Sequence, residues 1–166
     1  MLDKHQICAI DTSSLLAVRE TFGKTKEAQV FTTLSGYAEK GFIVFPPQVR
    51  EELERAEEAE TNPDPPLIWV RTHRETSERR PSLEAVRQVL AVVPELLDAD
   101  SPHEPADAYV VALAAELRDQ GFDARVITDD KKDRLPLKIS PTTAASVLRL
   151  LSQTLYAFLK SDGAAP

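Results

Sequence analysis

The sequence has few of the residues on which several common kinds of site depend. It contains one cysteine, Cys8, which excludes an internal disulfide, and its apolar neighbours predict a buried, inert thiol in a reducing compartment. The five glycines form no glycine-rich phosphate loop. No apolar run approaches the roughly 20 residues of a membrane span, and the first residues lack the apolar stretch of a secretory signal. These absences predict a cytoplasmic protein with no membrane partner.

Positive charge is also scarce. The chain has 20 Lys and Arg residues against 27 Asp and Glu, which gives a net charge of −7 at pH 7. This balance argues against a protein that coats DNA, because nonspecific binding to a duplex depends on many phosphate contacts from Lys and Arg. It does not exclude a nuclease, since metal ions held by carboxylates can supply positive charge locally.

What the sequence does contain is typical of a globular α/β protein. Its 166 residues are 42% hydrophobic and 28% charged, and we expect one domain over residues 1–166. Short apolar runs alternate with helical patterns, which predicts a three-layer α/β/α fold around a central, mainly parallel sheet. The expected strands are residues 6–10, 42–45, 67–70, 124–128 and 135–140. The expected helices are residues 13–22, 25–41, 46–60, 81–99 (kinked at Pro94), 105–121 and 141–160.

Acidic residues follow two of the expected strands. Asp11 comes directly after residues 6–10, and Asp129 and Asp130 follow residues 124–128. In parallel sheets, ligands bind beyond the carboxyl ends of the strands, so all three aspartates are candidates for a site. An aspartate at such a position can also cap a helix or form an Asx-turn. Position alone does not decide between the two interpretations.

Asp107 stands out by its place on a helix. On a helical wheel, Val110 and Val111 both lie within about 60° of it, so it falls within the apolar stripe. An unpaired carboxylate there would be costly to bury. The alternative is that Asp107 caps the helix, but Ser101 and Glu104 form an S-x-x-E capping box upstream. We therefore favour a functional role for Asp107.

The same geometry separates two glutamates in the helix expected over residues 46–60. Val49 and Leu53 define the face that points to the core. Glu52 lies about 60° from Val49, at the edge of that face, whereas Glu51 lies about 160° away and is expected to point to solvent. Glu52 is therefore the inward-facing candidate.

These carboxylates occur within four motifs that resemble the PIN domain family, which includes the VapC-type ribonuclease toxins of toxin–antitoxin modules. The motifs are IDTSSLL (10–16), PPQVREEL (46–53), PADAYVVALA (105–114) and VITDD (126–130). Each motif is weak alone, but the four follow the order and spacing of the family, and the match covers residues 6 to about 140. The resemblance implies the PIN fold and a metal-dependent endoribonuclease.

The resemblance also implies which residues form the site. The acidic residues of the family fall on Asp11, Glu52, Asp107 and Asp130, with Asp129 as a further metal-ligand candidate. The implied cofactor is Mg²⁺ or Mn²⁺, because carboxylate oxygens are the ligands that hard cations prefer. Ser13 matches a polar residue that orients the first aspartate. The three histidines are isolated in sequence, and we expect them at the surface.

The implied partners are an RNA substrate, an antitoxin protein and a second copy of the chain in a homodimer. The basic residues Arg71, His73, Arg74, Arg79 and Arg80 are candidates for RNA contact, although they could equally pair with Glu75 and Glu78 in a solvated loop. A free-standing RNA-processing nuclease and a catalytically silent binding module remain alternatives. A haloacid-dehalogenase-like phosphatase is disfavoured because it requires D-x-D, and the second position here is Ser13.

Overall fold

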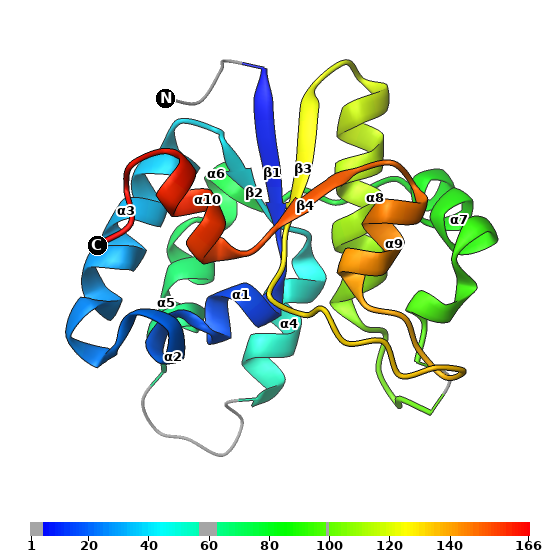
Figure 1. Cartoon of the computed structure of the whole chain (residues 1–166), viewed down its shortest axis with the longest axis horizontal. Helices are drawn as coiled ribbons and strands as arrows, with labels where there is room; N and C mark the ends of the chain where they lie inside the picture. Colours follow the sequence, from blue (N-terminus) through cyan, green and yellow to red (C-terminus); the bar gives the residue numbers. More distant parts are fainter. Residues whose placement is uncertain (1–4, 57–62, 99) are drawn as a thin grey trace.

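A parallel β-sheet forms the centre of the protein (Figure 1). The structure, a computed structural model, describes residues 5–56, 63–98 and 100–166. Within these residues the sheet has four strands in the order β2-β1-β3-β4, and all neighbours are parallel. The strands are β1 (Gln6–Ile10), β2 (Ile43–Val44), β3 (Asp123–Ile127) and β4 (Leu151–Gln153). The predicted α/β class is confirmed.

The register of the two central strands determines where the residues that follow β1 and β3 lie. β1 pairs with β3 along its whole length, from Gln6 opposite Asp123 to Ile10 opposite Ile127. Residues 7–10 of β1 are all buried, as expected for a strand covered on both faces. Because the two strands end level with each other, the residues that follow them leave the sheet side by side.

Helices cover both faces of this sheet. In Figure 1, α3, α5, α6 and α10 lie on one side of the strands, and α7, α8 and α9 lie on the other. The helices are α1 (Thr12–Leu16), α2 (Val18–Phe22), α3 (Lys24–Glu39), α4 (Pro47–Ala56), α5 (Pro65–Thr72), α6 (Arg74–Ser77), α7 (Leu83–Val92), α8 (Ala106–Asp119), α9 (Pro141–Val147) and α10 (Leu155–Ser161), with a 3-10 turn, η1, at Pro94–Leu96. This arrangement is compatible with the predicted three layers.

The strand predicted over residues 67–70 is wrong, because these residues belong to helix α5. A short apolar run fits a buried helix as well as a strand, and periodicity cannot separate the two. Pro65 and Pro66 at the first helical positions favour a helix start. The run then buries Leu67, Trp69 and Val70 against the rest of the core.

The prediction for the C-terminal part is also wrong. Residues 135–140 form no strand; they lie in a loop that carries only an isolated bridge between Arg134 and Lys138. The single helix expected over residues 141–160 is α9, strand β4 and α10. Arg149, with a positive φ of 57°, lies between α9 and β4. β4 then pairs with the open edge of β3, whose backbone groups would otherwise lack partners there.

Three other predicted helices differ in their limits or are divided. The helix expected over residues 13–22 is divided into α1 and α2. α4 extends to Ala56, and residues 57–60 of its predicted range lie outside the described residues. α7 ends at Val92, and η1 begins at Pro94, which agrees with the break predicted at that proline. Residue 99, the last of that predicted range, also lies outside the described residues.

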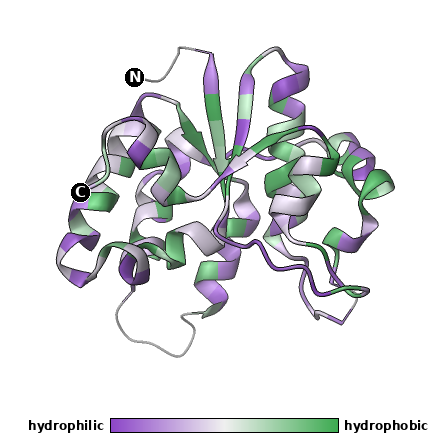
Figure 2. Ribbon diagram, viewed as in Figure 1, coloured by the Kyte–Doolittle hydropathy of each residue, from purple (hydrophilic) through white to green (hydrophobic). Residues whose placement is uncertain are grey.

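Hydrophobic residues gather on the strands and on the inward faces of the helices, as Figure 2 shows. The fully buried side chains include Phe45, Leu34 and Phe158. Cys8 is buried as predicted, and burial raises the pKa of its thiol to about 12. Within the part of the chain that the structure describes, no helix is both long enough and apolar enough to cross a membrane.

Candidate functional site

The candidate site begins where β1 and β3 end. The backbone N–H of Asp11 donates to the carbonyl of Ile127 over 3.0 Å, so Asp11 and Thr128 leave the sheet next to each other. The Thr128 hydroxyl then donates to Asp11 Oδ2 over 2.6 Å. Both residues are buried, at 1% exposure each. A carboxylate is therefore held beneath the surface at the carboxyl edge of the sheet.

Local contacts also hold the other oxygen of Asp11. The Ser13 hydroxyl and the Ser14 backbone N–H donate to Asp11 Oδ1 over 2.5 and 3.2 Å. Asp11 thus caps helix α1 as well as lying at the strand end, and Ser13 makes the orienting contact that the family resemblance implies. Burial raises the pKa of the Asp11 carboxyl to about 7 despite these hydrogen bonds, and the nearby charge of Asp107 contributes to the increase.

Glu52 joins three separate segments of the chain. Its Oε2 accepts from the Thr12 hydroxyl over 2.5 Å, and its Oε1 accepts from the backbone N–H of Ala106 over 2.7 Å. The second contact satisfies an N–H in the first turn of α8, which has no side-chain cap of its own. The wheel prediction that Glu52 points inward is confirmed by these contacts. The capping box predicted at Ser101 and Glu104 is wrong, since α8 begins after Pro105.

Asp107 lies in the first turn of α8, and its carboxyl senses the charges of several other acidic residues. Burial raises its pKa, and the charges of Glu52 and Asp130 raise it further. The ammonium group of Lys138 lowers it, because Lys138 Nζ lies 2.6 Å from Asp107 Oδ2. The charge of Asp107 also raises the pKa of Asp11, so Asp107 interacts electrostatically with each of the other candidate carboxylates named here. We call Asp11, Glu52, Asp107 and Asp130 the carboxylate cluster.

The neighbours Asp129 and Asp130 have different surroundings. Asp129 Oδ2 accepts from the Ser14 hydroxyl over 2.6 Å and from the backbone N–H of Leu155 over 3.3 Å, so it fastens the strand end to α1 and α10. Asp130 Oδ1 accepts only a 3.3 Å hydrogen bond from the backbone N–H of Lys132, and its charge reaches Asp107. Asp130 therefore belongs to the carboxylate cluster, whereas the contacts of Asp129 are structural.

The donor chemistry of the carboxylate cluster fits a hard divalent cation. All four groups offer carboxylate oxygens, and burial together with like charge disfavours the ionised forms of Asp11 and Asp107 unless a cation lies near them. In the arrangement described for residues 5–56, 63–98 and 100–166, however, no three His, Cys, Asp or Glu side chains form a metal-binding group. Protein donors already hold Asp11 and Glu52, and the Lys138 ammonium contacts Asp107. Nothing in the sequence had singled out Lys138.

The predicted basic segment is exposed at its four arginines but not at its histidine. His73 is buried rather than exposed, which makes the prediction for this histidine wrong; His5 and His103 are exposed as expected. Arg71 pairs with Glu54 at 3.4 Å, and Arg74 pairs with Glu78 at 3.7 Å. Arg79 and Arg80 are exposed. The arginines remain candidates for RNA contact, but His73 does not.

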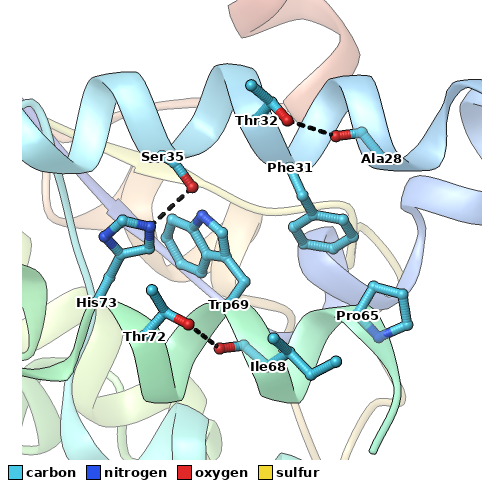
Figure 3. Close-up of a pocket in the computed structure, with 9 residues that line it drawn as sticks. All are labelled: Ala28, Phe31, Thr32, Ser35, Pro65, Ile68, Trp69, Thr72 and His73. Atoms are coloured by element: carbon cyan, nitrogen blue, oxygen red, sulfur yellow. Dashed lines mark hydrogen bonds between the residues drawn. The ribbon is translucent and has the colours of Figure 1, made fainter.

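His73 belongs instead to a small hollow between α3 and α5, shown in Figure 3. The hollow measures about 240 Å³. Its polar centre is a 2.7 Å hydrogen bond between His73 Nε2 and the Ser35 hydroxyl, beside the ring of Trp69. Burial lowers the pKa of His73, which favours its neutral form. We call it the aromatic hollow; it is lined by Ala28, Phe31, Thr32, Ser35, Pro65, Ile68, Trp69, Thr72 and His73. Sequence reasoning missed it because residues 67–70 resemble a strand.

No model of a known protein family matches the chain, and no curated protein matches it.

Proposed function

We propose that this protein is a metal-dependent endoribonuclease that hydrolyses RNA phosphodiester bonds at the carboxylate cluster. One observation carries the proposal: carboxylates from the ends of β1 and β3 and from helices α4 and α8 lie close enough to act on one another around Asp107. Four sequence motifs that resemble the PIN family provide independent support, because Asp11, Glu52, Asp107 and Asp130 fall on the acidic positions of that family.

Each residue has a role that its contacts support. Asp11, which is buried, and Asp107, which is partly buried, would hold Mg²⁺ or Mn²⁺ directly, and Glu52 and Asp130 would bind at its edge, directly or through water. The bound cation would polarise the phosphodiester and lower the pKa of the attacking water. Ser13 and Thr128 hold the Asp11 carboxylate in position, and the hydrogen bond from Ala106 fixes Glu52. Such positioning contacts affect metal affinity and activity in known metal sites.

The finer proposal is that the protein is the toxin of a VapBC-type pair. An antitoxin peptide would then bind near the carboxylate cluster and place an Arg or Lys among the carboxylates. A silent binding module of the same fold is a second candidate, and the ion pair between Lys138 and Asp107 favours it, because this contact occupies a ligand oxygen. Metal-dependent cleavage of RNA separates the two candidates.

The decisive experiment measures cleavage of labelled RNA by the purified chain with Mg²⁺, with Mn²⁺ and with EDTA. Asp11→Asn and Asp107→Asn should each lower the metal-dependent rate by at least about a hundredfold, because each removes a charged ligand while leaving the shape of the side chain unchanged. Asp119→Asn is the matched control, since Asp119 lies on the same helix as Asp107 but pairs with Arg118 at the surface. Full activity in folded Asp11→Asn or Asp107→Asn would refute the site.

A further inference from the structure

The loop between β3 and α9 carries a cation into the carboxylate cluster. Residues 131–140, which we call the crossover loop, are hydrophilic over their first part, as Figure 2 shows after β3. Near the end of this loop, Lys138 Nζ lies 2.6 Å from Asp107 Oδ2, and the two side chains are only 12% and 14% exposed. The other lysines of the loop, Lys131 and Lys132, are exposed. Lys138 alone among these three points inward.

The backbone of the crossover loop is fixed on both sides of Lys138. Lys138 and Arg134 exchange two backbone hydrogen bonds, of 2.7 and 3.0 Å. The next residue, Ile139, is 7% exposed and donates to the carbonyl of Glu95 over 3.1 Å. Asp133 holds the start of α9 by accepting from the Ser140 backbone N–H over 2.8 Å. Lys138 is therefore directed at Asp107 by an ordered backbone rather than by a chance side-chain conformation.

The contact joins the ammonium group of Lys138 to Asp107, whose carboxyl lies near several other acidic groups. The charges of Glu52 and Asp130 raise the pKa of Asp107, and the charge of Asp107 raises the pKa of Asp11. A single positive charge at its Oδ2 offsets part of the repulsion among these groups. A divalent cation bound by Asp107 would use the same oxygen and supply twice the charge. The ammonium group and a metal ion held by this oxygen would therefore compete for one position.

We propose that Lys138 is an internal counter-ion that closes the carboxylate cluster, and that a divalent cation binds by displacing its ammonium group from Asp107. This inference rests on the proposed function. Lys138 then sets how much metal the protein needs, and loading the metal requires the base of the crossover loop to loosen. The ammonium group released in this way stays near the carboxylates, where a phosphate would lie.

Direct binding of Mn²⁺ to the full chain tests this competition without reference to catalysis. Calorimetry should show that Lys138→Met binds Mn²⁺ about tenfold more tightly than the wild-type chain, because the competing charge has been removed. Lys138→Arg, which keeps the charge, should stay closer to the wild type. Lys132→Met is the matched control, since it removes an exposed lysine of the same loop, and it should bind Mn²⁺ as the wild type does.

A second measurement uses the wild-type chain and does not depend on whether Lys138→Met folds. Saturating Mn²⁺ should speed hydrogen exchange at the amides of Arg134 and Lys138, because displacing the ammonium group loosens the loop base. Equal Mn²⁺ affinity in the wild type and Lys138→Met, or exchange that Mn²⁺ leaves unchanged or slows, would overturn this inference and leave the nuclease proposal standing. Absence of Mn²⁺ binding in both proteins at millimolar concentration would overturn both proposals.

Discussion

The carboxylate cluster and the aromatic hollow both bury polar side chains, but they balance them differently. In the aromatic hollow, the hydrogen-bonded Ser35–His73 pair lies beside Trp69 among largely apolar walls, and burial lowers the pKa of the histidine, which favours its neutral form. In the carboxylate cluster, burial raises the pKa of both Asp11 and Asp107, and Lys138 is the cation that contacts Asp107. The first region pairs Ser35 with His73 but leaves the buried Trp69 Nε1 without a hydrogen-bond partner among the described residues, whereas the second brings several acidic groups close to one lysine.

This difference indicates which region performs chemistry. A matched neutral pair contributes to packing and requires no ligand. Clustered carboxylates with insufficient positive charge destabilise the metal-free protein, and a divalent cation relieves that cost. The contrast therefore predicts that substitutions in the carboxylate cluster change metal binding and activity, while substitutions in the aromatic hollow change only stability.

The largest effect in this comparison is expected at Glu52. Glu52→Gln should lower metal-dependent RNA cleavage by about 10- to 100-fold, because it removes a charge while the side chain keeps one oxygen that can accept from Thr12 or Ala106. Glu51→Gln should change the rate by less than about twofold, since the two residues lie about 100° apart on the helix. Initial rates measured at matched thermal stability decide this prediction. Equal losses in the two variants would contradict the assignment of Glu52.

The next effect concerns the stability of the metal-free protein as the pH changes. The pKa of Asp11 is raised to about 7 in the folded chain and is about 4 in the unfolded chain. Between these values the unfolded chain has released the proton and the folded chain still holds it, so stability falls as pH rises. Denaturation in EDTA should show a loss on the order of a few kcal/mol from this group between pH 5 and pH 8.

Asp11→Asn is the control for that pH dependence. An asparagine does not titrate, so the variant should be more stable than the wild type at pH 8 and should show a smaller decrease from pH 5 to pH 8. The difference between the two proteins should shrink when Mn²⁺ is added at pH 8, because the cation favours the ionised carboxylate. Identical pH profiles in EDTA would mean that Asp11 is not the residue responsible.

A smaller effect should separate Asp129 from Asp130. Asp130→Asn should raise the Mn²⁺ concentration for half-maximal cleavage by about tenfold and leave stability unchanged, because the side chain makes few protein contacts. Asp129→Asn should lower the free energy of unfolding by about 1 kcal/mol without changing the Mn²⁺ requirement, because it weakens the contacts with Ser14 and Leu155. A shifted Mn²⁺ requirement in Asp129→Asn alone would move the site by one residue.

The smallest effect is expected in the aromatic hollow. Ser35→Ala removes the hydroxyl that pairs with His73 and should lower the free energy of unfolding by about 1 kcal/mol. Cleavage rate and Mn²⁺ affinity should match those of the wild type, since the hollow shares no residue with the carboxylate cluster. Thermal unfolding and a cleavage assay at one Mn²⁺ concentration are sufficient. A clear loss of cleavage in the folded variant would show that the two regions are coupled.

Much of this contrast could be predicted from local patterns in the chain. The apolar runs at 6–10 and 124–128 predicted the two central strands, and the shared edge of parallel strands predicted where Asp11 and Asp130 would lie. Helical periodicity predicted that Glu52 would face inward. The same reasoning failed at α5 and at β4, where short apolar segments fit more than one structure. It also misplaced His73, because this residue is buried only if α5 is a helix.

Local sequence determined most of the helices and strands and which of their faces are buried. The reason is that each buried face requires apolar residues at a regular spacing, which can be read from neighbouring positions. Tertiary structure alone decided which polar groups meet. Thr128 reaches Asp11 across 117 positions, and Glu52 caps a helix 54 positions away at Ala106. Lys138 likewise reaches Asp107 only because the crossover loop returns over α8. Tertiary packing brings these distant residues into contact, and those contacts determine how much positive charge lies near the carboxylate cluster.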